Sequence, residues 1–204
     1  MKKIKNIIFD LGGIFIDIDF LQTEKAFKAL GVANWNKFYT QSTASALFEN
    51  LETGKITPEE FYENFRKESG VALSDEQIRD AWIAMLGTFP VQRLRWLQEI
   101  KKRYNIYLYS NTNLIHYIAF QKIFRDCTGE KNFDDYFIKA HYSHELGVRK
   151  PYPESFIKLL YIENLNANET LFIDDTANNI EGAKEAGLQT ILLLPPKTVL
   201  DLDL

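Results

Sequence analysis

The chain reads Asn6-Ile7-Ile8-Phe9-Asp10-Leu11-Gly12-Gly13 near its beginning. Residues 6–10 form a short β-branched and aromatic run that ends at a carboxylate, and such a run favours a buried strand. Two glycines follow almost at once, and glycine pairs mark turns. We therefore expect a buried strand that carries Asp10 at its carboxyl-terminal tip.

Similar apolar runs recur later in the chain, with helical stretches between most of them. These runs are Ile106–Ser110, Phe137–His141, Thr170–Asp174 and Thr190–Leu194. Alternation of strands and helices is typical of a mostly parallel sheet that is covered by helices on both faces. The sequence therefore predicts an α/β fold.

The pattern changes between about residues 20 and 89, where apolar residues follow helical spacing without a convincing strand. These residues include Phe27, Leu30, Phe38, Leu51, Phe61, Phe65, Ile78, Trp82 and Leu86. Thr57-Pro58-Glu59-Glu60 and Ser74-Asp75-Glu76-Gln77 have the capping hydroxyl of a helix start, and the first also has proline at the first helical position. We interpret this segment as a helical insert. Its aromatic residues Trp35, Phe38, Tyr39 and Phe48 are expected to form its core, with one or two of them available to contact a ligand.

Composition restricts the possible functions. The 204 residues are 46% apolar and 14% aromatic, which fits one globular domain with a modest insert. A net charge of −4 argues against affinity for nucleic acid or an anionic membrane. Cys127 is the only cysteine, so no intrachain disulfide can form, and no run approaches the ~20 apolar residues of a membrane helix. We expect a cytoplasmic protein, either a monomer or a homodimer.

Four polar clusters stand where the expected strands end. They are Asp10, Ser110-Asn111-Thr112-Asn113, Lys150-Pro151 and Asp174-Asp175. Because the carboxyl ends of parallel strands share one edge of a sheet, these groups can converge in one crevice. Each cluster alone has an ordinary explanation as a turn, a helix cap or a solvated charge. Their joint order is what favours a single site.

The clusters have complementary chemistry. Neighbouring carboxylates repel unless a hard cation neutralises them, and Mg²⁺ prefers carboxylate oxygens, waters and substrate phosphate. A hydroxyl, backbone amides and a lysine can hold phosphoryl oxygens while charge develops on them. Asp10 could then attack phosphorus, since positioning and electrostatic stabilisation supply most of what phosphoryl transfer requires.

In this order the clusters resemble the motifs of the haloacid dehalogenase superfamily. The matching segments are Phe9-Asp10-Leu11-Gly12-Gly13, Tyr109-Ser110-Asn111-Thr112, Arg149-Lys150-Pro151 and Ile173-Asp174-Asp175-Thr176-Ala177-Asn178-Asn179. More narrowly, Asp10 to Phe20 together with residues 110–113 resemble bacterial sugar-phosphate phosphatases of the α-glucose-1-phosphatase kind. This resemblance implies a small phosphorylated metabolite, such as a sugar phosphate, as the substrate.

The resemblance also implies an architecture and a metal site. Residues 1–19 and 90–204 would form a Rossmann-like core, and residues 20–89 a helical cap. Asp10 would be both nucleophile and magnesium ligand, and the backbone carbonyl of Gly12 a second ligand. Asp175 aligns with a direct ligand, whereas Asp174 would bind the ion directly or through water.

By the same resemblance, Ser110 and Asn111 bind the transferring phosphate, and Lys150 steadies both the phosphate and Asp10. The sequence departs from the family pattern at Gly12, where most family phosphatases have an aspartate that acts as general acid and base. The loss of such a group typically costs ~10²–10⁴ in rate. Asp17 and Asp19 lie nearby in the sequence, but nothing in it shows that either reaches the leaving oxygen.

Three functions therefore follow from the sequence. The leading one is a magnesium-dependent phosphatase that forms an aspartyl-phosphate on Asp10. A metal-independent haloacid dehalogenase is an alternative, although it gains nothing from Asp174-Asp175. A non-catalytic, receiver-like phosphate-binding protein is the third, because Gly12 removes the group expected to hydrolyse the intermediate. Two further sets of residues have no assigned role: His116, His141 and His144 lack metal-ligand spacing, and Glu49, Thr53, Lys55 and Arg66 are polar enough to contact a sugar.

Overall fold

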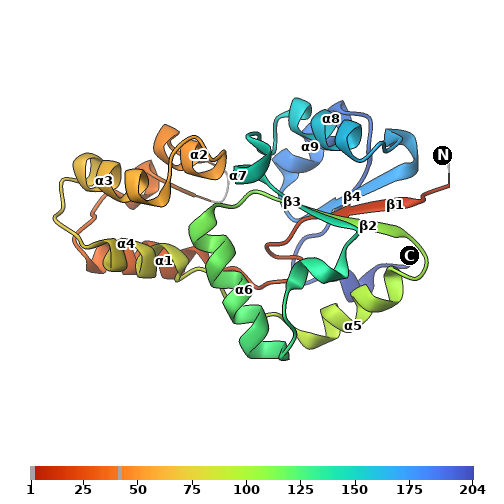
Figure 1. Cartoon of the computed structure of the whole chain (residues 1–204), viewed down its shortest axis with the longest axis horizontal. Helices are drawn as coiled ribbons and strands as arrows, with labels where there is room; N and C mark the ends of the chain where they lie inside the picture. The colour runs from red at the N-terminus through yellow and green to blue at the C-terminus, as the bar shows by residue number, and fades with distance from the viewer. Residues whose placement is uncertain (1–2, 41–42) are drawn as a thin grey trace.

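The computed structural model describes residues 3–40 and 43–204 and contains a five-stranded parallel sheet (Figure 1). The strands are β1 (Asn6–Phe9), β2 (Asn105–Ser110), β3 (Lys139–Tyr142), β4 (Thr170–Asp174) and β5 (Gln189–Leu192). Their order is β3-β2-β1-β4-β5, the arrangement of a Rossmann-like sheet. The α/β fold predicted from the sequence is confirmed.

Several strand boundaries differ from the expected ones by one or two residues, most of all in β3 and β5. β3 begins at Lys139 rather than Phe137, because residues Phe133–Tyr136 form a 3₁₀ helix and Phe137 is its C-terminal cap. β5 ends at Leu192, before the two prolines that follow Leu194. Apolar side chains near a strand end do not by themselves show where the ladder of hydrogen bonds stops.

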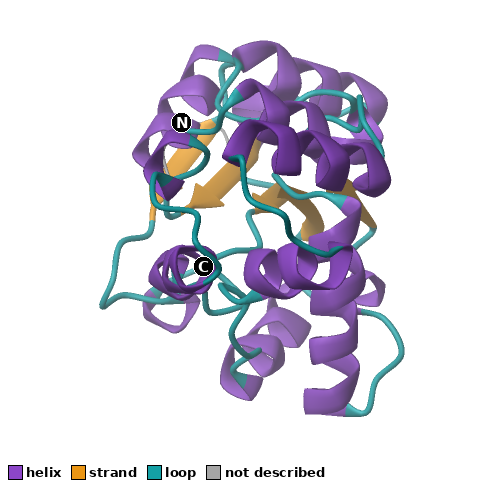
Figure 2. Ribbon diagram, turned by 90° about the vertical axis from the view of Figure 1, so that its left-hand side faces the viewer, coloured by secondary structure: helices purple, strands orange, loops and turns teal. Residues whose placement is uncertain are grey.

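Helices cover both faces of the sheet, as Figure 2 shows. They are α5 (Val91–Ile100), α6 (Leu114–Thr128), α7 (Ser143–Leu146), α8 (Pro153–Ile162) and α9 (Ala177–Glu185). Successive residues of β1 bury opposite faces: Phe9 packs in the hydrophobic cluster that includes residues of α5 and α6, whereas Ile8 packs in the one that includes residues of α8 and α9. The central strand is thus buried on both sides, which explains its continuous apolar sequence.

The segment between β1 and α5 is helical. It contains α1 (Phe20–Ala29), the 3₁₀ helix Trp35–Lys37, α2 (Ala46–Glu52), α3 (Pro58–Ser69) and α4 (Asp75–Ile83), which lie apart from the sheet in Figure 1. Thr57 and Ser74 each form the predicted capping interaction, accepting a hydrogen bond from the backbone of Glu60 and Gln77, respectively. Proline at the first position of α3 is likewise confirmed.

This helical segment has its own aromatic core. Trp35, Phe48 and Trp82 are buried in it, and Phe38 and Tyr39 pack against it while partly exposed. Phe48 makes an edge-to-face contact with Trp82 at 4.9 Å between ring centroids, the geometry that aromatic quadrupoles favour. The segment therefore buries most of its aromatic side chains against one another, and Ile115 of α6 joins the same cluster.

Two contacts of the helical segment with the rest of the chain lie at α6 and α7. At the first, the His116 ring of α6 stacks on Trp82 of α4 at 4.4 Å, and its Nε2 lies 3.0 Å from the Trp82 carbonyl oxygen. At the second, Gly54 lies so close to the backbone of His144 that a Cβ at position 54 would overlap the carbonyl oxygen of His144. Both contacts bring the helical segment against elements that follow β2 and β3.

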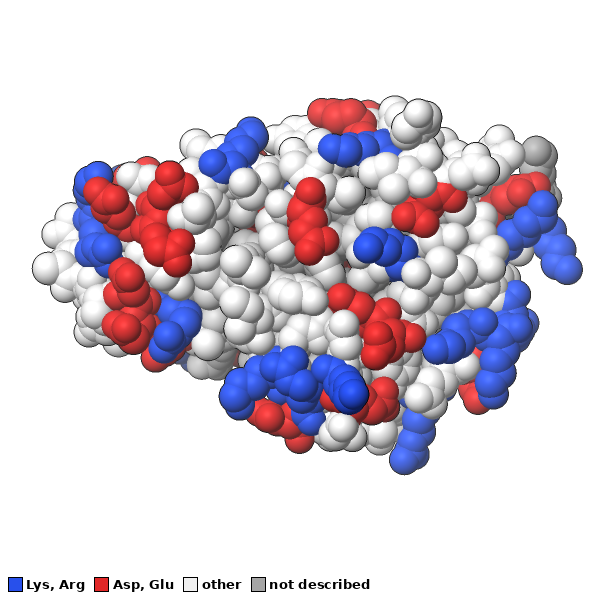
Figure 3. All heavy atoms as spheres, viewed as in Figure 1, with Lys and Arg blue, Asp and Glu red and all other residues white. Residues whose placement is uncertain are grey.

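Charged side chains on the face in Figure 3 are interspersed in sign. Several pairs lie within one helix, such as Lys28 with Glu24 at 2.6 Å and Lys67 with Glu63 at 2.7 Å. Such exposed pairs contribute little to stability. Within the described part of the chain, no helix is long and apolar enough to cross a membrane.

The contact of His116 predicts a pH-dependent stability. Burial lowers the pKa of His116 to about 4, whereas a histidine in the unfolded chain titrates near 6.5. The unfolded state therefore takes up the proton first, and stability is lost as the pH falls from about 6.5 towards 4. His116 should account for about 2 kcal/mol of the stability lost between pH 8 and pH 5.

Urea unfolding of wild type and His116→Gln at both pH values measures this contribution. The variant loses the stack on Trp82 and should be less stable at pH 8, but its stability should fall less steeply towards pH 5. Equal losses in the two proteins would contradict a neutral, buried His116.

Candidate active site

The predicted polar clusters lie together at the carboxyl-terminal edge of the sheet. Asp10 directly follows β1, and its backbone N–H donates to the carbonyl of Ile173 at 2.9 Å, which places it beside Asp174 at the end of β4. The chain crosses from one side of β1 to the other between these strands, and ligands of α/β sheets bind at such switch points. The sheet order therefore brings two sequence-distant carboxylates together.

Lys150 joins these two carboxylates. Its Nζ donates to Asp10 Oδ1 and to Asp174 Oδ2, both at 2.7 Å, and its side chain is only 1% exposed. An ammonium group buried to this degree is stable only when it is paired and hydrogen-bonded. Burial opposes the charge of Lys150, but the two aspartates outweigh that effect and raise its pKa. Lys150 is therefore a fixed positive charge at the centre of the site.

The carboxylates outnumber this single positive charge. One oxygen from each of Asp10, Asp174 and Asp175 lies within 4.8 Å of the others. Burial raises the pKa of Asp10 to about 7, with Lys150 opposing the shift and the two neighbouring aspartates adding to it. Burial, reinforced by Asp174, also raises the pKa of Asp175 to about 6. The cluster therefore has the charge and the oxygen donors that suit a hard divalent cation.

The two acidic residues after β4 differ in how far their oxygens are already used. Asp174 accepts from Lys150, from the backbone N–H of Thr176 at 2.7 Å and from the amide of Asn179. Asp175 accepts from the Thr176 hydroxyl at 3.1 Å. Gly13 has φ +70°, and a Cβ there would overlap the Asp175 carboxylate. Asp175 thus has more capacity left for a metal ion, in a space that only glycine leaves open.

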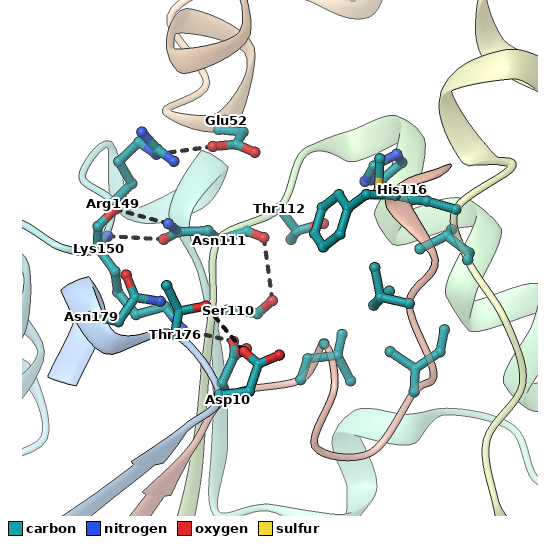
Figure 4. A pocket seen from close by; sticks show the side chains of 18 of the residues that line it. Asp10, Glu52, Ser110, Asn111, Thr112, His116, Arg149, Lys150, Thr176 and Asn179 are labelled. Atoms are coloured by element: carbon teal, nitrogen blue, oxygen red, sulfur yellow. Dashed lines mark hydrogen bonds and ion pairs between the residues drawn. The ribbon is translucent and has the colours of Figure 1, made fainter. Parts of the chain in front are cut away.

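Ser110 and Asn111 lie at the end of β2 beside this cluster (Figure 4). Asn111 holds the backbone of Lys150 by two hydrogen bonds of 2.9 Å, one donated by its amide and one accepted by its carbonyl. Both residues line a pocket whose wall also includes Asp10, Asp175, Tyr39 and Glu52. Asn111 therefore fixes the position of the loop that carries Lys150, a role that its sequence motif did not reveal.

The neighbouring polar residues of this motif have structural partners. The backbone N–H of Thr112 donates to the Ser143 hydroxyl at 2.9 Å, and the side chain of Asn113 caps α6 by accepting from the N–H of His116. Sequence reasoning had allowed for such a cap. The Ser110–Asn113 motif thus combines pocket-lining residues with a helix start.

The space beside Gly12 is filled by another side chain. A Cβ at position 12 would lie 3.3 Å from Cγ1 of Ile18 and 4.0 Å from Oδ2 of Asp10. Asp17 instead pairs with Arg93 at 2.9 Å, and Asp19 caps α1 by accepting from the N–H of Leu21 at 3.0 Å. Neither aspartate lines the pocket. Neither one therefore stands in for the missing carboxylate at position 12.

A second polar network lies where the helical segment forms part of the pocket wall. Arg149 Nη1 pairs with Glu49 Oε1 at 2.8 Å, and its Nε lies 2.9 Å from Glu52 Oε2. The Tyr39 hydroxyl donates to Glu52 Oε1 at 2.9 Å. Sequence reasoning named Glu49 as a polar candidate but missed Glu52, and it placed Tyr39 in the core of the insert. In the sequence, the only indication of this network was the position of Arg149 directly before Lys150.

The other two histidines have structural partners. His141 pairs with Glu163 at 2.8 Å, and His144 lies beside Tyr142 with a ring separation of 6.0 Å. Among the described residues, the group that could hold a metal contains only Asp10, Asp174 and Asp175.

Comparison with known proteins identifies several relatives of this chain. A family model described as haloacid dehalogenase-like hydrolase matches residues 4–187. A D-ribitol-5-phosphate phosphatase of Bacteroides thetaiotaomicron is 33% identical over 188 residues, which cover 92% of this chain and 90% of that protein. A predicted HAD-like family hydrolase of known structure from Porphyromonas gingivalis is 29% identical, covers 94% of this chain and 91% of its own, and has a TM-score of 0.84.

A further solved structure is a HAD family enzyme of Bacteroides thetaiotaomicron, an aspartate-to-alanine variant in complex with magnesium and inorganic phosphate. It is 33% identical to this chain, the match covers 95% of this chain and 96% of that protein, and the TM-score is 0.89. The family match spans most of the chain, and the relatives cover it almost completely. The chain therefore belongs to the haloacid dehalogenase-like hydrolase family.

Proposed function

We propose that this protein is a magnesium-dependent phosphatase that hydrolyses the phosphomonoester of a small metabolite, a sugar or polyol phosphate. The observation that carries the proposal is the buried Lys150, which bridges Asp10 and Asp174 beside the carboxylate of Asp175. The similarity to a D-ribitol-5-phosphate phosphatase supports the substrate class. The magnesium and phosphate in a 33% identical structure support the cofactor.

Asp10 acts as the nucleophile. Its carboxylate attacks phosphorus, the bond to the leaving oxygen breaks as that oxygen takes a proton from water in the pocket, and an aspartyl-phosphate forms. A water molecule then attacks the same phosphorus and gives up a proton to solvent, the bond from phosphorus to Asp10 breaks, and inorganic phosphate and the Asp10 carboxylate are released. Bound Mg²⁺ neutralises the excess carboxylate charge and that of the phosphoryl oxygens.

The surrounding residues hold the phosphate and the ion. Ser110 and Asn111 bind the transferring phosphate, and Lys150 keeps both Asp10 and the phosphoryl oxygens in place. Asp175 and Asp10 bind the magnesium ion together with the backbone carbonyl of Gly12. Asp174, whose oxygens already accept several hydrogen bonds, completes the ligand sphere directly or through water.

The helical segment acts as a cap. We propose that residues 20–89 cover the pocket of a core formed by residues 1–19 and 90–204. Tyr39, Glu52 and Met85 support this division, because they line the same pocket as Asp10. The resulting enzyme acts in the cytoplasm as a monomer or homodimer, and its partner is the small phosphorylated metabolite.

The two alternatives explain the site less well. A metal-independent dehalogenase has no use for three carboxylates around one lysine, since their mutual repulsion would go uncompensated. A receiver-like protein needs no pocket walled by a helical insert, whereas a phosphatase uses such a wall to enclose its substrate.

The acidic cluster predicts opposite effects of Asp175→Asn with and without magnesium. Because the pKa of Asp175 is raised, its ionised form costs stability above about pH 6, and that cost disappears in the amide. The metal-free variant should therefore melt at a higher temperature than wild type at pH 8. It should bind magnesium at least ~10–100-fold more weakly, because a charged ligand is lost.

Thermal melting with and without MgCl₂, together with calorimetric titration, tests both effects. Asp17→Asn is the matched control, since Asp17 lies outside the cluster and pairs with Arg93. Magnesium affinity that is unchanged in Asp175→Asn, or lowered equally in Asp17→Asn, would contradict the assigned site.

Asp10→Asn should abolish phosphate release. The amide has the same shape but cannot attack phosphorus, so kcat should fall at least ~10³-fold. The assay measures magnesium-dependent release from D-ribitol 5-phosphate and from p-nitrophenyl phosphate, whose leaving group needs no proton. Wild-type turnover of the aryl ester alone would mean that Gly12 limits the enzyme to good leaving groups. Activity retained in Asp10→Asn would refute the nucleophile.

A further inference from the structure

The wall opposite the acidic cluster contains a buried carboxylate that the phosphatase chemistry does not use. Glu52 is 2% exposed and lies at the C-terminal end of α2, where Tyr39 and Arg149 are its partners. Figure 4 shows Glu52 and Arg149 towards one end of the pocket and Asp10 towards the other. The pocket thus has two charged ends with different chemistry.

The contacts of Glu52 leave hydrogen-bonding capacity unused. A carboxylate has about four acceptor positions, and Glu52 Oε1 accepts one hydrogen bond, from Tyr39. Its Oε2 forms an ion pair with Nε of Arg149 at 2.9 Å. A buried carboxylate with so few partners calls for an explanation. Stability alone is a poor one, since buried ion pairs contribute little to it.

Tyr39 connects this carboxylate with the pocket. Its hydroxyl proton is donated to Glu52, so its oxygen can only accept a further hydrogen bond. Tyr39 lines the pocket and is partly exposed, and the charge of Asp10 adds to the rise of its pKa. Burial is the largest cause of that rise, followed by Glu52. Tyr39 therefore presents a neutral acceptor to whatever occupies the pocket.

One part of the remaining pocket wall is apolar. It is formed by side chains of the segment after β1 and of the linker after α4, together with one from α6: Ile16, Ile18, Phe20, Met85, Leu86 and Phe120. A pocket with hydrogen-bond acceptors on one side and apolar groups on the other suits a ligand with hydroxyls along one edge and C–H groups along the other. A polyol chain has this character.

The charge balance at this end is negative. Arg149 faces two carboxylates, those of Glu49 and Glu52, and each lies within 2.9 Å of its guanidinium nitrogens. A second phosphate or a carboxylate on the ligand would approach uncompensated negative charge, and such contacts are unfavourable. The end near Lys150 accepts an anion, whereas the end near Glu52 favours a neutral, hydroxylated group.

We propose that Tyr39 and Glu52 determine substrate specificity: the Tyr39 oxygen accepts hydrogen bonds from the hydroxyls of an uncharged polyol tail, and the Glu52 carboxylate excludes a second anionic group. This inference rests on the proposed phosphatase function. Arg149 is a positioning residue that holds Glu52 in place.

Two substrate comparisons test the two roles separately. The first compares kcat/KM for D-ribitol 5-phosphate with that for p-nitrophenyl phosphate, which has no hydroxylated tail. Tyr39→Phe should lower this ratio about tenfold, mainly through KM, because one hydrogen bond is lost. The second compares ribitol 5-phosphate with D-ribonate 5-phosphate, in which a carboxylate replaces the terminal alcohol. Glu52→Gln should reduce this preference about tenfold, because the repulsive charge is removed.

Matched controls separate these effects from a general loss of packing. Glu49→Gln makes the same change in the same helix and on the same arginine, but Glu49 does not line the pocket. Tyr152→Phe removes a hydroxyl that lies 3.5 Å from Glu49, also away from the pocket. Both controls should shift the two ratios clearly less than Tyr39→Phe and Glu52→Gln do, because neither Glu49 nor Tyr152 lines the pocket.

The proposal is overturned if the ratios stay unchanged in Tyr39→Phe and Glu52→Gln while both enzymes remain active. It is also overturned if the controls shift the ratios equally. If one of the two variants does not fold, the substrate ratio measured with the other variant still tests the role of the residue that it replaces. A wild-type protein that releases no phosphate from either ester through Asp10 would refute the phosphatase function itself, which is a distinct result.

Discussion

The structure of the site depends on one ammonium group. Lys150 lies between Asp10 and Asp174 at 2.7 Å from each, and all three side chains are buried. Without that charge the two carboxylates would repel one another in a region that water hardly reaches. With it, the cluster still has an excess of negative charge that a divalent cation can balance. One contact therefore sets both the geometry of the nucleophile and the need for magnesium.

Several backbone features serve to keep Lys150 in that position. Asn111 binds the backbone of Lys150 through both its amide and its carbonyl. Gly182 of α9 packs so tightly on the carbonyl of Pro151 that a Cβ would overlap it. Arg149, the preceding residue, is held by carboxylates of the helical segment. The lysine is thus fixed from the end of β2, from α9 and from the helical segment. The two ends of the pocket are therefore connected through the adjacent residues Arg149 and Lys150.

The sequence predicted the fold and the acidic cluster because both depend on local patterns. Strand ends are readable from apolar runs, and a parallel sheet brings them to one edge. The Tyr39–Glu52–Arg149 network could not be predicted, since it forms between α2 and a loop about 100 residues later, and no local pattern specifies how two such elements face each other. The sequence alone showed that Gly12 replaces the usual aspartate. It could not show that Ile18 lies beside Gly12, because that contact depends on how the following turn folds back.

The central claim is that Asp10 becomes phosphorylated during turnover, and chemical trapping tests it most directly. Wild-type protein is mixed with p-nitrophenyl phosphate and MgCl₂, quenched in acid within the first turnover, and treated with borohydride, which reduces an aspartyl-phosphate to homoserine. Peptide mass spectrometry then locates the product. The account predicts homoserine at position 10 and at no other aspartate. Phosphate release with no modification at Asp10, or with modification at another aspartate, would contradict it.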